Sequence, residues 1–156
     1  MALLSPEARY SDLKGSLKKY FVDSLVTGES KELYFKYLKD VPLDGNGAKL
    51  ASWIIINFGE MELGSVASCP IEINLFTRND LEGDDLAALF DVLMSYIVDE
   101  NSINGLKTIP FYNTTELPWT LVGGIIPYIT RIFEDEEGKD STKIKTIHIT
   151  CKWGSK

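Results

Sequence analysis

The sequence is poor in the residues that build catalytic and metal centres. It has one histidine and two cysteines among 156 residues, and no Cys-x-x-Cys pair. It has no phosphate-binding Gly-Lys-Ser/Thr run, and Gly123-Gly124 lacks the following glycine and the strand-to-helix context of a dinucleotide-binding loop. No apolar run approaches the ~18–20 residues that span a membrane. These absences predict a protein without a cofactor, metal ion or membrane segment, and they argue against an enzyme.

Basic residues are also too few for ordinary nucleic-acid binding. Sixteen Lys and Arg stand against 23 Asp and Glu, which gives a formal charge of −7. Sequence-independent binding depends on Lys and Arg that neutralise phosphates, so we do not expect it here. The charge remains compatible with DNA that must slide past without being held.

The N-terminal sequence and the cysteines bear on the compartment. Residues 1–7 have neither the basic segment nor the long apolar segment of a secretory signal peptide, so we expect synthesis in the cytoplasm. Cys69 and Cys151 could be buried apolar residues, a disulfide or a reactive pair. Without a secretory context, the buried and reduced state is favoured.

The length and a hydrophobic content of 44% predict a single domain over residues 1–156 with a core of its own. Ser5-Pro6-Glu7 predicts a helix start with a hydroxyl cap, and an apolar stripe then indicates a helix over 6–26. A second stripe predicts a helix over 84–99. The acids at its start, Asp80, Glu82, Asp84 and Asp85, favour helix capping over a calcium loop, whose ligand spacing they do not supply.

Six apolar runs predict strands, and the segments between them predict loops. The strands are expected at 33–38, 52–58, 71–76, 106–113, 125–133 and 147–153, with loops at 40–49, 114–119 and 134–141. Pro110 favours an edge position for the fourth strand. The last two strands are expected to form a long antiparallel hairpin. The fold class is therefore α+β, with an antiparallel or mixed sheet of about five to six strands and two helices packed on one face.

Single polar and aromatic residues leave alternatives open. His148 could be a general base, but it has no partner at a recognisable spacing, which favours an exposed or hydrogen-bonded structural residue. Trp53 is expected in the core, whereas Trp119 lies in a Pro-containing loop and is a candidate interface anchor. The acidic turn over 134–137 could be a solubilising hairpin tip or an arm that meets a basic patch on a neighbouring subunit.

The elements run from the N-terminal helix through the single helix at 84–99 to the closing hairpin at 143–153. This order resembles that of the tail terminator proteins of long-tailed phages, the lambda type in particular, and of the related tail-completion proteins. The resemblance covers residues 6–153. It implies a hexameric ring in the virion that caps the tail tube, contacts head-completion proteins and lets DNA pass without specific binding. An acidic pore would suit this role because carboxylates repel phosphates.

The resemblance also implies that loops and strand edges pair with neighbouring subunits. The candidate interface residues are Asp44, Asn46, Lys49, Trp119, Glu134, Asp135, Glu136, Glu137 and Lys139. Two alternatives remain: a monomeric adaptor that offers a sheet edge to a partner peptide, and a small carboxylate-dependent enzyme without a local motif.

Overall fold

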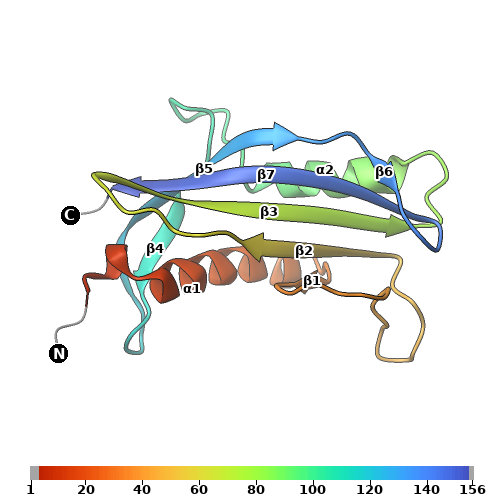
Figure 1. Cartoon of the computed structure of the whole chain (residues 1–156), viewed down its shortest axis with the longest axis horizontal. Coiled ribbons are helices and arrows are strands. Elements are labelled where there is room, and N and C mark those ends of the chain that lie inside the picture. The colour runs from red at the N-terminus through yellow and green to blue at the C-terminus, as the bar shows by residue number, and fades with distance from the viewer. Residues whose placement is uncertain (1–3, 155–156) are drawn as a thin grey trace.

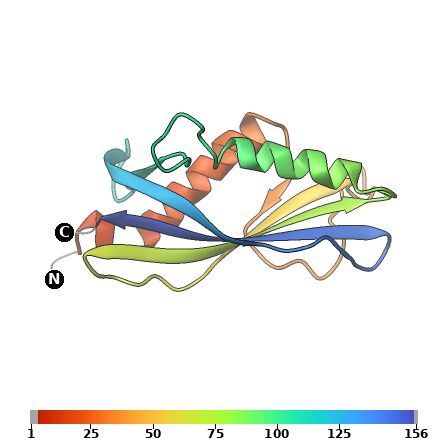
Figure 2. The same cartoon turned by 90° about the horizontal axis from the view of Figure 1, so that it is seen from above.

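A long curved sheet carries both helices on one of its faces (Figures 1 and 2). The computed structural model describes residues 4–154. The strands are β1 (Leu33–Tyr34), β2 (Ser52–Phe58), β3 (Val66–Arg78), β4 (Ile109–Asn113), β5 (Thr120–Ile132), β6 (Glu136–Glu137) and β7 (Thr142–Gly154). The sheet order is β1-β2-β3-β7-β5-β4, with β6 as an additional short neighbour of β7. All pairs are antiparallel except β1 with β2, so the sheet is mixed. The predicted α+β class with helices on one face is confirmed.

The first helical region has three parts: a 3-10 turn (Pro6–Ala8), α1 (Tyr10–Phe21) and a π-helical turn (Val22–Thr27). Its extent agrees with the predicted 6–26, but Arg9 is extended and separates the first turn from α1. The predicted hydroxyl cap is wrong, because the Ser5 side chain makes no capping hydrogen bond. The second helix, α2 (Asp84–Ser95), begins where predicted and ends four residues early. None of these described helices is long and apolar enough to cross a membrane.

The predicted length of the strand over 33–38 is wrong, because only two of its residues pair with β2. Lys36 and Tyr37 are exposed to solvent. β3, β5 and β7 are longer than predicted. β5 and β7 form the predicted hairpin, and β4 is an edge strand as expected.

Alternation along the central strands separates a helix-covered face from an uncovered face. On β3, Ile71, Ile73 and Leu75 are buried beneath the helices, and on β7 their neighbours Ile147 and Ile149 are buried with them. The intervening side chains point to the other face. The first half of β5 curls with β4 toward α1 (Figure 2). The uncovered face is shielded in part by the segment 38–41 and the turn between β6 and β7.

Three residues discussed above have defined positions on these faces. Cys69 and Cys151 are directly opposed in the β3–β7 ladder, fully buried on the helix side, and both are free thiols. Trp53 is buried as predicted, but on the face without helices. There it stacks on Phe76 with ring centres 5.0 Å apart, beneath the segment 38–41 and the β6–β7 turn.

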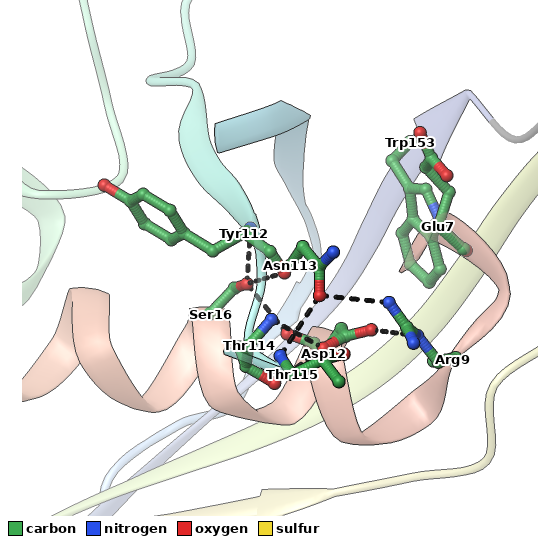
Figure 3. A network of polar contacts seen from close by, with 9 residues as sticks. All are labelled: Glu7, Arg9, Asp12, Ser16, Tyr112, Asn113, Thr114, Thr115 and Trp153. Atoms are coloured by element: carbon green, nitrogen blue, oxygen red, sulfur yellow. Dashed lines mark hydrogen bonds and ion pairs between the residues drawn. The ribbon is translucent and has the colours of Figure 1, made fainter. Parts of the chain in front are cut away.

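A buried polar network joins α1 to β4 (Figure 3). The Asp12 carboxylate pairs with the Arg9 guanidinium and accepts hydrogen bonds from the Thr114 amide (2.8 Å) and hydroxyl (2.6 Å). One turn later, the Ser16 hydroxyl accepts a hydrogen bond from the Tyr112 amide at 2.8 Å. Among the described residues, β4 has no neighbouring strand on this side, and its buried backbone amides still need hydrogen-bond acceptors. The side chains of α1 supply these acceptors.

Candidate interface site

All the candidate interface residues except Trp119 lie at one end of the sheet. The loop before β2 and the turn between β5 and β7 meet there, opposite the end at which the first and last described segments lie (Figure 1). We call these two segments, 43–49 and 134–141, the loop end. An ion pair between Lys49 and Asp140 joins them, although the two residues are 91 positions apart in the chain.

Asp140 is the residue that holds the two segments of the loop end together. A guanidinium nitrogen of Arg78, at the end of β3, lies 3.8 Å from the same carboxylate that pairs with Lys49. The hydrogen bond from Lys49 lowers the pKa of Asp140, and the charges of Lys49 and Arg78 lower it further. Asp140 and Ser141 both adopt positive φ values, 61° and 56°, which shape the turn. The sequence did not identify Asp140 or Arg78 as part of this site.

The segment 43–49 is ordered by its own side chain at Asp44. One carboxylate oxygen of Asp44 accepts hydrogen bonds from the amides of Asn46 (2.8 Å) and Ala48 (3.0 Å). Leu43 and Lys49 form an isolated bridge that closes the loop, and Gly47 has φ 82° within it. Asp44 therefore shapes the loop, while the Asn46 side chain remains exposed.

The acidic turn is partly neutralised within the chain. Asp135 pairs with Lys145 at 2.8 Å, and Glu137 pairs with Lys143 at 3.0 Å. Glu134, Glu136 and Lys139 are exposed and have no ion-pair partner among residues 4–154. Two carboxylates of the turn therefore remain free for contacts outside this chain.

A hollow of about 430 Å³ lies between this turn and the start of α2. Its wall includes Asp80, which is buried and accepts hydrogen bonds from the amides of Leu86 (2.8 Å) and Asp85 (3.1 Å) and from the Thr77 hydroxyl (3.0 Å). Burial raises the pKa of Asp80, but these hydrogen bonds and the nearby charge of Lys143 outweigh it, so the net pKa is lowered. The predicted capping role of the acids before α2 thus falls to Asp80. Leu81, on the rim, is almost wholly exposed.

Trp119 belongs to the opposite end of the molecule. Its ring lies 6.2 Å from that of Tyr112, and its edge faces Gly15 on α1. The side chain is therefore half-buried against its own chain. The exposed apolar residue of this loop is Leu117, which the sequence did not single out.

The uncovered sheet face carries a second hollow, of about 270 Å³, beside His148. The His148 Nε2 atom lies 3.7 Å from a Glu72 carboxylate oxygen, and the Phe133 ring meets the imidazole edge-on with ring centres 4.7 Å apart. Arg131 lies over Phe133, 4.2 Å from its centre. The hydroxyl residues at its margin are Thr130 and Thr150. His148 is half-exposed.

Within residues 4–154, no three His, Cys, Asp or Glu side chains gather closely enough to hold a metal ion. No protein-family model matches the chain. No curated protein sequence matches it either.

Proposed function

We propose that the chain is a non-catalytic, ring-forming subunit of a phage tail terminator or neck, which caps the tail tube and offers the surface to which the head docks. The observation that carries this proposal is the loop end: two segments far apart in sequence are gathered at one end of a long sheet and present unpaired charges outward. The order of elements, from α1 through α2 to the β5–β7 hairpin, is the order on which the resemblance to tail terminators rests.

The loop end is suited to protein contacts because its shape is fixed before any partner arrives. The Lys49–Asp140 pair and the Asp44 hydrogen bonds hold the two segments in place. A preordered surface loses less conformational entropy on binding than a flexible loop. Glu134 and Glu136 then remain available to meet cations of a neighbouring copy or of the tube.

The distribution of acid is consistent with a ring through which DNA passes. Residues 80–100 contain seven carboxylates and no Lys or Arg. A surface of this charge repels phosphates at distances up to about 8–10 Å at physiological salt. The carboxylates that a contact between copies leaves exposed would therefore help to keep DNA from binding to the ring.

The test is the mass of the protein alone and with assembled tail tubes, measured by sedimentation velocity and native mass spectrometry. We expect a closed multimer near six copies of the 17.5 kDa chain, and rings at tube ends in electron micrographs. Glu134→Lys with Glu136→Lys should weaken assembly. The matched pair Glu60→Lys with Glu62→Lys, in the β2–β3 loop, should not. A wild-type protein that stays a single chain beside its tube would overturn the proposal.

The free strand edge of β5 favours a second candidate, a monomeric adaptor. Residues 126–132 pair with β7 on one side, whereas β4 pairs only with residues 120–125 on the other. Tyr128 and Ile132 are exposed along this segment. An extended peptide could add to such an edge through main-chain hydrogen bonds. A strict monomer that captures a peptide, and loses it when Thr130 is replaced by Pro, would favour this function over the ring.

A further inference from the structure

The outward side of α2 and part of the uncovered sheet face carry side chains of opposite charge. The outward side of α2 presents an exposed stripe formed by Asp84, Ala87, Ala88, Asp91 and Ser95. These positions follow helical spacing and lie opposite the buried Leu86, Leu89 and Leu93. We call them the acidic stripe. Its two central residues are alanines, so another backbone can approach it closely.

The uncovered sheet face presents cations held over aromatic rings. Arg131 lies over Phe133, and the Lys152 ammonium lies over the Tyr128 ring, 5.3 Å from its centre. The β5–β7 register aligns Arg131 with His148, which places both on the face away from the helices. We call these five residues the cationic patch. Glu72 stands beside it, with its carboxylate turned toward His148.

We propose that the acidic stripe of one copy docks on the cationic patch of the next, so that the α2 helix of a neighbour covers the sheet face that each chain leaves open. This inference rests on the proposed ring and names its contact surfaces. Figure 2 shows that the helices and the uncovered face lie on opposite sides of the molecule. Copies joined in this way meet through unlike surfaces, an arrangement that generates a ring when the rotation between copies closes and an open filament when it does not.

The spacing of charges on the two surfaces supports the match. Asp84 and Asp91 are seven residues apart on a helix, which places them about 10 Å apart along its axis. Arg131 is in register with His148, and Lys152 is four residues farther along β7, so the two cations are separated by about 14 Å along the strands. Long flexible Arg and Lys side chains can cover the difference, and the alanines between the acids leave room for the Tyr128 ring.

Charge reversal tests this contact in a way that folding defects cannot imitate. One variant carries Arg131→Glu and Lys152→Glu, and the other carries Asp84→Lys and Asp91→Lys. Each double reversal changes the formal charge by four units from −7, to −11 and −3. Each variant alone should lose association at least tenfold in sedimentation velocity with tubes present. Mixed together, they should assemble with alternating copies, although both remain negatively charged overall.

The controls are Lys36→Glu with Lys39→Glu and Glu60→Lys with Glu62→Lys, which reverse exposed charges outside both surfaces and should leave association unchanged. Far-UV circular dichroism verifies that every variant is folded. If the wild type forms rings and both charge-reversed variants form them equally well, the named surfaces are wrong while the ring remains. If the mixture fails to assemble, the pairing of these surfaces is wrong. If the wild type never associates, the proposed ring itself fails.

Discussion

Asp12 gives the most direct test of how α1 is attached to the edge of the sheet. Its side chain is almost fully buried, and its carboxylate joins Arg9 on the preceding turn to Thr114 at the end of β4 (Figure 3). Replacing Asp12 by Ala would remove the ion pair and both hydrogen bonds at once. The Arg9 side chain, only 14% exposed, would then keep a charge with no carboxylate to balance it.

The expected magnitude follows from these contacts. Removing one partner of a buried ion pair costs about 3–5 kcal/mol, and a hydrogen bond to a charged group contributes about 1.5–3 kcal/mol. These contributions overlap, so we expect Asp12→Ala to lower the free energy of unfolding by about 4 kcal/mol. Asp12→Asn keeps an acceptor for Thr114 but not the ion pair, and should cost about 2 kcal/mol. Thr114→Val removes only the hydroxyl bond and should cost about 1.5 kcal/mol.

Urea denaturation followed by tryptophan fluorescence, at one low protein concentration, measures these differences. Asp23→Ala is the matched control, because Asp23 pairs with Lys19 on the exposed side of the same helical region and should contribute less than about 0.5 kcal/mol. A double-mutant cycle of Asp12→Ala and Thr114→Val should show a coupling of at least about 1 kcal/mol. A loss below about 1 kcal/mol for Asp12→Ala, or additive effects within about 0.5 kcal/mol, would refute the account of the network.

Three further predictions concern other buried groups. Because the pKa of Asp80 is lowered in the folded protein, its ionisation stabilises the fold above the unfolded pKa near 3.8, and this contribution is lost as the pH falls through the folded pKa. The difference in the free energy of unfolding between the wild type and Asp80→Asn, measured by urea titration, should therefore be constant between pH 5 and 7 and become smaller below about pH 4. A difference that does not change with pH would contradict this. Burial raises the pKa of Cys69 to about 11 and that of Cys151 higher still, so a thiol reagent should label neither in the native protein and both after unfolding. Trp153→Phe loses the indole hydrogen bond to the Glu7 carbonyl (2.9 Å) and should lower the free energy of unfolding by about 1 kcal/mol, and an unchanged urea midpoint would show that this bond contributes nothing.

Periodicity in the sequence was sufficient to locate the elements whose one face is buried. The stripe from Leu86 to Leu93 and the strict alternation from Ile147 to Trp153 predicted α2 and β7 because each buries a single side against the same core. The positions at which the strands begin were harder to predict from the sequence. β3 begins at Val66, but Pro70 interrupts the pattern, and Gly123-Gly124 hides the first half of β5 in the same way.

The loop end was predicted only as separate segments. Nothing in the sequence indicates that Lys49 meets Asp140, because this contact depends on strand order: β2 and β7 both flank β3, so the loop before β2 and the turn before β7 emerge at the same end. The acids before α2 were predicted as caps, but the choice of Asp80 depends on the positive φ of Asn79 (56°), which turns the chain back toward the helix start. Asn adopts positive φ more often than most residues, but the sequence alone does not show at which Asn the chain turns in this way.

The hydrogen bond between the Trp153 indole and the Glu7 carbonyl also determines how the protein can be handled in the laboratory. The first and last described segments lie together, at the end of the molecule away from the loop end (Figure 1). A fluorophore or affinity handle fused to either terminus would leave the loop end unobstructed, and a copy immobilised on a sensor chip would present it to solution. A short peptide could join the first and last described segments, so that the chain could be reopened in an exposed connection without removing any strand from the sheet.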